Sequence, residues 1–147
     1  MSAEPTFIAR QPILDQDGRV YGYELLFRRN STSESCDTVA EIASATVITN
    51  AVVGIGLDTL TQGRRAFVNV GRRMLLEGIS EVLPAHRVVI ELTEDIEADA
   101  DTIDACHRLR RAGYTLALDD FVLNERTEAL VPLADFIKID FLGTSDP

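Results

Sequence analysis

The sequence predicts an α/β fold with a mostly parallel sheet, and three features of the chain support this prediction. Strand patterns and helical patterns alternate from residue 38 to residue 141, which is typical of βα units. Two strand patterns near the start are joined by a short turn, so the sheet should open with an antiparallel pair. A length of 147 residues, with 46% apolar and 26% charged residues, suits one globular domain over residues 1–147.

The antiparallel pair is predicted at residues 7–14 and 20–28. Pro12 lacks a backbone N–H and should confine the first strand to an edge or an irregular position. The segment 15–18 is rich in Asp and Gly, which favour a turn. Glu24 lies inside the second strand, where its carboxylate must have a partner or a metal, or else face solvent on a half-exposed strand.

The middle of the chain begins the strand and helix alternation. A helix is expected from about residue 38 to residue 54, because apolar residues recur at helical spacing and glycines follow them. A short strand at 66–70 should end near Asn69. A brief helix is expected around residues 74–76.

The best-defined helix is expected after a strand at residues 87–94. The acidic segment 95–104 favours the start of a helix, since the positive end of the helix dipole stabilises carboxylates. Cys106 and Leu109 lie on its apolar stripe, and Gly113 should end it. The remaining predicted elements are a strand at 115–121, a short helix around 127–130 and a last strand at 136–141.

Composition argues against several classes of partner. The formal net charge of −10 disfavours binding to a nucleic-acid polymer or to an anionic membrane surface. Cys36 and Cys106 form no disulfide framework or metal-binding pattern, so reduced, buried thiols are expected. No signal-peptide pattern follows Met1, and no apolar run approaches the roughly 20 residues that span a bilayer. The protein is therefore expected in the cytoplasm.

Polar side chains recur near the carboxyl ends of the predicted strands. Right-handed crossovers place those ends on one face of a parallel sheet, so these side chains should meet there. Oxygen ligands without clustered Cys or His favour a hard divalent cation such as Mg²⁺, Mn²⁺ or Ca²⁺. The residues concerned are Asn69, Glu91, Asp119, Asp120 and Lys138, with Glu24 joining them from the hairpin.

This set of residues indicates metal-dependent phosphoester hydrolysis. The adjacent Asp119 and Asp120 can serve two metals, or one metal and one water, as in enzymes that catalyse displacement at phosphorus. Lys138 can hold the attacking water or neutralise a phosphoryl oxygen.

Each candidate also has a purely structural explanation. Asn69 and the Asp119–Asp120 pair could be turn residues at strand ends. The acids of segment 95–104 could be helix-start charges, and Lys138 could face solvent in an alternating strand. The functional interpretation is favoured because several strands repeat the same placement.

Taken together, these residues resemble the EAL domain, the cyclic di-GMP phosphodiesterase family of bacterial signalling. The resemblance implies an incomplete TIM-type barrel with an antiparallel first strand, of which this chain holds the N-terminal two-thirds. The matching segments, in order, are Gln11-Pro12-Ile13, Tyr23-Glu24-Leu25-Leu26, Phe67-Val68-Asn69-Val70, Glu91-Leu92-Thr93-Glu94, Leu118-Asp119-Asp120-Phe121 and Lys138-Ile139-Asp140.

The resemblance also implies a role for each site residue. The expected cofactor is Mg²⁺ or Mn²⁺, with Ca²⁺ as an inhibitor, and the expected ligand is cyclic di-GMP. Lys138 should lie near the catalytic water and Asp120 should reach a second metal. Gln11 and Arg28 should contact the base and the phosphate of the dinucleotide. The residues expected to bind the first metal are Glu24, Asn69, Glu91 and Asp119.

Departures from the family pattern qualify the expected activity. Leu25 replaces the signature alanine, and Val122 replaces a glycine in a loop that helps couple metal binding to dimerisation. A complete barrel of this type has about 250 residues, and the family's later strands carry a further catalytic glutamate and a glutamine that these 147 residues do not include. Little or no turnover is therefore expected. The alternative function is a non-catalytic nucleotide-binding, protein-binding or dimerisation module.

Two partners besides the nucleotide are expected. Segments 7–15 and 23–28 are most similar to the subgroup in which an EAL-like domain precedes an HDOD domain, so a C-terminal HDOD domain is expected in the full protein. Many members of that subgroup are catalytically silent. An open barrel would leave strand edges unpaired, which predicts pairing with another copy as a homodimer or oligomer.

Overall fold

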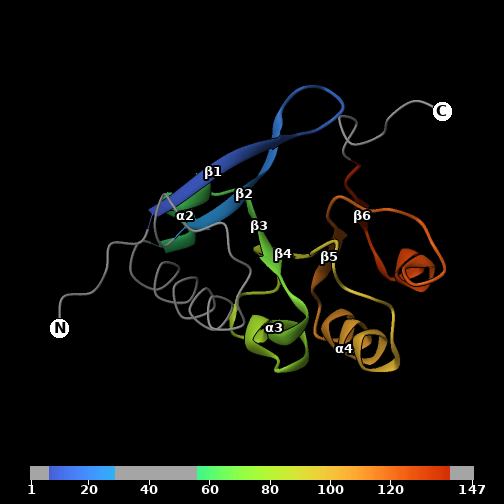
Figure 1. The fold of residues 1–147 in the computed structure, drawn as a ribbon. Coiled ribbons are helices and arrows are strands. Elements are labelled where there is room, and N and C mark those ends of the chain that lie inside the picture. The colour runs from blue at the N-terminus through green and yellow to red at the C-terminus, as the bar shows by residue number, and fades with distance from the viewer. Residues whose placement is uncertain (1–6, 29–55, 140–147) are drawn as a thin grey trace.

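The computed structural model describes residues 7–28 and 56–139, and these form one curved, open sheet with helices on its outer face (Figure 1). The strand order is β1-β2-β3-β4-β5-β6, with β1 antiparallel to β2 and every later neighbour parallel. The predicted incomplete barrel with an antiparallel first strand is therefore confirmed. The strands are β1 Phe7–Leu14, β2 Val20–Arg28, β3 Arg65–Val70, β4 Val88–Leu92, β5 Thr115–Leu118 and β6 Phe136–Ile137.

The helices of the described residues are short except for α4. The helix predicted at 38–54 lies outside the described residues, as does Cys36. Asp99 caps α4, because its side chain accepts a hydrogen bond from the backbone N–H of Thr102. No helix among the described residues has the length and apolarity to cross a membrane. The helical segments are α2 Leu57–Thr61, α3 Arg72–Leu76, η2 Ile79–Val82, α4 Ala100–Arg111 and η3 Glu128–Leu133.

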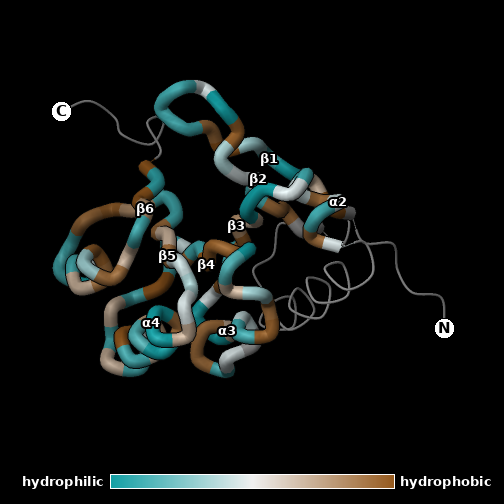
Figure 2. Tube along the Cα trace, turned by 180° about the vertical axis from the view of Figure 1, so that it is seen from behind, coloured by the Kyte–Doolittle hydropathy of each residue, from teal (hydrophilic) through white to brown (hydrophobic). Residues whose placement is uncertain are grey.

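The opening hairpin follows the predicted pattern. Pro12 lies on β1, which is an edge strand of the sheet. An edge strand tolerates a proline because one of its sides pairs with no other strand. The turn between β1 and β2 is mostly hydrophilic (Figure 2). Gly18 adopts φ 74°, a conformation that favours glycine, and its N–H donates to the carbonyl oxygen of Asp15.

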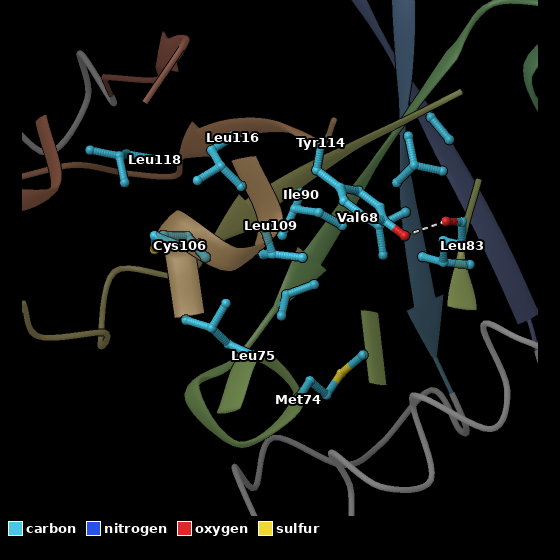
Figure 3. Close-up of a cluster of buried hydrophobic side chains, with 14 of the residues drawn as sticks. Val68, Met74, Leu75, Leu83, Ile90, Cys106, Leu109, Tyr114, Leu116 and Leu118 are labelled. Atoms are coloured by element: carbon cyan, nitrogen blue, oxygen red, sulfur yellow. Dashed lines mark hydrogen bonds between the residues drawn. The ribbon is translucent and has the colours of Figure 1, made fainter. Parts of the chain in front are cut away.

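The main core lies between the outer face of the sheet and helices α3 and α4 (Figure 3). Alternate residues of the central strands face this core, and the helices supply aliphatic side chains against them. Cys106 is a free, buried thiol, as predicted. The labelled core residues of Figure 3 are Val68, Met74, Leu75, Leu83, Ile90, Cys106, Leu109, Tyr114, Leu116 and Leu118.

A smaller apolar cluster, which we call the floor, covers the inner face of the sheet. Its buried members are Phe67, Val89 and Ala117, and Phe136 packs against them. Tyr21 adds an aromatic ring whose centroid lies 6.1 Å from that of Phe67 and 5.5 Å from that of Phe136.

The hairpin is shaped to fit this floor. Ile13 pairs with Gly22 and Leu14 with Val20, so Tyr21 is the extra residue of a β-bulge. A Cβ atom at Gly22 would lie 2.8 Å from the ring of Phe67 and 2.8 Å from the carbonyl oxygen of Arg65. Glycine is therefore required at position 22 for the hairpin to approach the floor this closely.

Candidate metal centre

A polar layer lies on the inner face of the sheet, one step beyond the floor toward the carboxyl ends of the strands. Side chains two residues apart along a strand share a face. Each floor residue is therefore followed, two positions later, by a polar residue on the same side. The four pairs are Phe67 and Asn69, Val89 and Glu91, Ala117 and Asp119, and Phe136 and Lys138.

Lys138 lies at the centre of this layer and contacts three carboxylates. Its ammonium nitrogen Nζ is 2.9 Å from Oε2 of Glu24, 2.9 Å from Oε1 of Glu91 and 2.7 Å from Oδ1 of Asp119. The solvent-facing alternative for Lys138 is therefore wrong. Glu24 is level with Phe67 in the sheet register, so its side chain extends along the inner face to reach the layer.

Asn69 and Glu91 are adjacent in the register of β3 and β4, and both present oxygens that lack hydrogen bonds. The amide Nδ2 of Asn69 donates to Oε1 of Glu24 at 3.0 Å. Oδ1 of Asn69 and both carboxylate oxygens of Glu91 are buried and accept no hydrogen bond from the described residues. Oε1 of Glu91 does have a charged partner, because the ammonium of Lys138 lies 2.9 Å away as an ion pair.

The burial of Glu91 changes its acidity. Its side chain is 0% exposed, and burial raises its pKa to about 7, against the lowering effect of Lys138. The negative charges of Glu24 and Asp119 contribute to this rise in the pKa. For Lys138, burial lowers the pKa, but its contacts with Asp119, Glu24 and Glu91 outweigh burial, so the pKa is raised and the ammonium stays charged.

The turn that carries Asp119 and Asp120 is held from both sides. The N–H of Asp119 donates to the carbonyl oxygen of Leu92, and the N–H of Phe121 donates to that of Lys138. Asp120 has φ 44°, a left-handed conformation that is uncommon for a residue other than glycine. This bend turns the chain immediately after Asp119.

Asp120 is exposed and, together with Asp119, borders a cavity of about 210 Å³ between the ends of β4 and β5 and the following loop. Glu94, Val122 and Asn124 also line this cavity.

The two predicted nucleotide contacts lie on the hairpin. Gln11 is exposed and lies directly opposite Glu24 in the antiparallel register. Directly opposed residues share a face of the sheet, so Gln11 is on the side of the polar layer. The backbone of Arg28 pairs with Phe7 at the end of β2, and its side chain lies outside what the structure describes.

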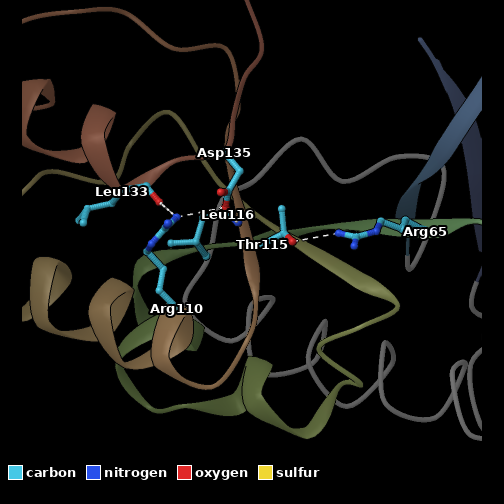
Figure 4. A network of polar contacts seen from close by, with 6 residues as sticks. All are labelled: Arg65, Arg110, Thr115, Leu116, Leu133 and Asp135. Carbon is cyan, nitrogen blue, oxygen red and sulfur yellow. Dashed lines mark hydrogen bonds and ion pairs between the residues drawn. The ribbon is translucent and has the colours of Figure 1, made fainter.

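A polar clamp that sequence patterns did not reveal holds the strand before Lys138 (Figure 4). The carboxylate of Asp135 accepts a hydrogen bond from the N–H of Leu116 at 3.0 Å and forms an ion pair with Arg110 at 3.1 Å. Arg110 also donates to the carbonyl oxygen of Leu133. Only the spatial proximity of α4, β5 and β6 identifies this clamp, because its members are far apart in sequence.

The donor set fits a hard divalent cation. Buried oxygens without hydrogen bonds are rare in folded proteins, and those of Asn69 and Glu91 are both of a type that Mg²⁺, Mn²⁺ and Ca²⁺ prefer. In the described conformation no three acidic, His or Cys side chains form a ligand group by themselves. The three carboxylates nearest one another are instead bridged by the ammonium of Lys138.

Comparison with known protein sequences identifies two relatives. The chain is 34% identical over 144 residues to the uncharacterized protein YuxH of Bacillus subtilis. That alignment covers 95% of this chain and 35% of YuxH. It is also 34% identical over 141 residues to the cyclic di-GMP phosphodiesterase CdgJ of Vibrio cholerae, covering 94% of this chain and 32% of CdgJ. The chain thus spans about a third of the length of these relatives. No protein-family profile matches it.

Solved structures share the same fold. Bacillus subtilis YkuI, which has an EAL domain and was solved with cyclic di-GMP and calcium, matches with a TM-score of 0.70 and 20% identity, over 93% of this chain and 42% of YkuI. Klebsiella pneumoniae BlrP1, solved with manganese and cyclic di-GMP, matches with a TM-score of 0.61 and 22% identity, over 95% of this chain and 41% of BlrP1. The chain therefore has the fold of EAL domains and is homologous to a cyclic di-GMP phosphodiesterase.

Proposed function

We propose that this chain binds a divalent cation and cyclic di-GMP at the polar layer, as part of a bacterial signalling protein of the phosphodiesterase type. One observation carries the proposal: buried oxygens of Asn69 and Glu91 without hydrogen bonds lie beside two further carboxylates at the carboxyl ends of the strands. Parallel α/β folds bind their ligands at these ends. The relative CdgJ and the bound ligands of YkuI and BlrP1 support the choice of nucleotide and cation.

The proposed ligands of the cation are Glu24, Asn69, Glu91 and Asp119, with Mg²⁺ or Mn²⁺ as the working ion and Ca²⁺ as an inhibitor. When bound, such an ion polarises a phosphoryl oxygen and makes its bound water more acidic. Asp120, at the rim of the neighbouring cavity, is the candidate ligand for a second ion.

The remaining site residues would orient the dinucleotide. Lys138 supplies a positive charge for the attacking water or a phosphoryl oxygen. Gln11 lies on the same side as the polar layer and is exposed, which suits contact with a base. Arg28 is the candidate for the phosphate.

We expect this chain to bind the nucleotide more readily than it cleaves it. Val122 replaces the glycine of the family pattern, and its side chain is 70% exposed beside the cavity. A β-branched residue restricts backbone freedom where the family has its most permissive residue. The second candidate function, a non-catalytic binding or dimerisation module, is supported by the same substitution.

A second copy is the proposed protein partner, and an HDOD domain is proposed to follow in the full protein. β1 and β6 end the sheet, and their outer edges are not paired with each other within the described residues. Ile137 and Ile139 are exposed along the β6 side. Sedimentation velocity at micromolar concentration should show a dimer, and a stable monomer would contradict this partner.

The decisive experiment compares the wild type with Asp119→Asn, which replaces one charged ligand by a neutral side chain of the same size. Each protein is titrated with cyclic di-GMP in the presence of Mn²⁺, and linear product is followed by chromatography. We expect nucleotide binding that Asp119→Asn weakens at least about tenfold, since a charged contact is lost. Asp104→Asn on the exposed face of α4 is the matched control and should bind like the wild type.

The outcomes separate the candidate functions. Product that Asp119→Asn abolishes would establish the phosphodiesterase and contradict the expected silence. Binding without product would establish a receptor, and neither binding nor product would leave the dimerisation module.

A further inference from the structure

Lys138 is the only lysine of the chain, and the other 13 of its 14 basic Lys and Arg residues are arginines. Arginine presents a planar fork of donors, whereas lysine presents a compact point charge with three donors on one atom. The contacts of Lys138 match that difference, because three carboxylates converge on a single nitrogen within 2.9 Å. A guanidinium spreads its charge over three nitrogens and could not place one atom against all three.

The same three carboxylates are proposed ligands of the divalent cation. Glu24, Glu91 and Asp119 come from β2, β4 and the end of β5, so the fold brings their oxygens to one point. An ammonium and a divalent cation that both require these oxygens repel each other at close range. They cannot both keep the full set.

We propose that the ammonium of Lys138 and the divalent cation compete for these carboxylates, so that cation binding turns Lys138 away from at least two of them. This rests on the proposed function, because it assumes a cation at the polar layer. The released ammonium then faces the dinucleotide. Binding of the cation thereby makes a phosphate-binding charge available that the carboxylates otherwise hold.

The surroundings of Lys138 allow its side chain to move while its backbone stays in place. Its N–H donates to the carbonyl oxygen of Leu118, and its own carbonyl oxygen accepts from the N–H of Phe121. The side chain is 32% exposed, and it follows β6, the last strand of the described sheet. Glu91, in contrast, is fully buried and cannot follow the ammonium outward.

The test measures Mg²⁺ binding by titration calorimetry, without nucleotide, for the wild type and Lys138→Met. Methionine keeps the length of the side chain and removes the competing charge. We expect Lys138→Met to bind Mg²⁺ about tenfold more tightly or better, since a like charge near the ion is removed. Arg19→Met removes one positive charge at the hairpin tip, where Arg19 is exposed and paired with Asp17, and should leave the affinity within about twofold.

A second measurement uses the wild type and so does not depend on the folding of Lys138→Met. With ¹³C at the ε carbon, the single lysine gives one ε-methylene signal in an NMR spectrum. We expect Mg²⁺ to shift this signal. The Mg²⁺ concentration at the midpoint of the shift should match the dissociation constant from calorimetry.

The outcomes distinguish this inference from the proposed function. Equal or weaker Mg²⁺ affinity in Lys138→Met, or Mg²⁺ binding that leaves the lysine signal unmoved, overturns the competition while the cation site stands. Absence of Mg²⁺ binding in both proteins overturns the cation site and the competition together. Tighter binding in Lys138→Met with a moving wild-type signal supports both.

Discussion

The floor and the polar layer occupy the same face of the same strands, two residues apart, yet they have opposite requirements. The floor is buried and apolar, so its contribution is packing. The polar layer holds a carboxylate that is equally buried, and its oxygens lack hydrogen bonds. Burial stabilises the first group and destabilises the charged form of the second. Positions two residues apart on one strand therefore have opposite physical requirements, and substitutions at the two kinds of position should have distinguishable effects.

The largest expected effect follows from breaking the floor. Phe67→Ala removes a ring that packs against Phe136 and Tyr21, and it should lower the free energy of unfolding by about 3–5 kcal/mol, as for other buried aromatic residues. Urea denaturation monitored by circular dichroism measures this loss. Phe67→Leu, which retains most of the volume, is the control and should cost less. A loss below about 1 kcal/mol would show that the floor is not a structural layer.

The next effect concerns the buried carboxylate of the polar layer. The pKa of Glu91 is raised from 4.5 to about 7 in the fold, so the folded protein holds a proton that the unfolded chain has released. Stability from this group is complete below pH 4.5 and is lost as the pH rises through 7. In the presence of a chelator, the free energy of unfolding of the wild type should fall by about 2 kcal/mol between pH 5 and pH 8. The free energy of unfolding of Glu91→Gln should not show this fall.

The same variant separates stability from function. Glu91→Gln should be more stable than the wild type at pH 8, since a neutral side chain replaces a buried charge, but it should bind Mg²⁺ poorly. Chemical denaturation at the two pH values and calorimetry measure the two properties. A pH dependence that persists in Glu91→Gln would assign it to another group.

The smallest effect concerns the clamp that supports the layer from outside. Asp135→Ala leaves the N–H of Leu116 without its side-chain acceptor and removes the partner of Arg110. The expected loss in the free energy of unfolding is about 1–2 kcal/mol. Mg²⁺ affinity should also weaken, because β5, which leads to the proposed ligand Asp119, is less well held. Asp135→Asn can still accept the hydrogen bond and should recover much of the stability. Equal losses in both variants would mean that the ion pair, not the hydrogen bond, holds the strand.

Much of the fold could be predicted from sequence because its elements are strongly patterned. Apolar runs identified every strand of the described sheet, and an isolated carboxylate in such a run marked Glu24 and Glu91 as exceptional. The strands predicted at 87–94 and 115–121 were longer than β4 and β5, because the sequence does not show where pairing with the neighbouring strand ends. β6 covers only Phe136–Ile137 of the strand predicted at 136–141, whose last two residues lie outside the described part of the chain. α2 and η2 were not predicted, because short helical turns carry little periodicity.

The candidate site was less predictable than the fold. The side chains of Asn69, Glu91, Asp119 and Lys138 could be assigned to one end of the sheet, and the structure brings them together there. The three contacts of Lys138 could not be predicted, because they depend on how far the strands curve. For the same reason the bulge at Tyr21 and the clamp at Asp135 appear only in three dimensions.

The two-residue step between floor and polar layer also limits how this domain can vary in evolution. A one-residue insertion between Val89 and Glu91 would rotate everything after it to the opposite face, placing a carboxylate in the helix-covered core. An insertion of two residues would preserve the faces, but it would move Glu91 roughly 6–7 Å along the strand, away from Asn69 and Lys138. The length of β4 between Val89 and Glu91 should therefore be fixed, whereas the loops between strands and helices should vary more freely.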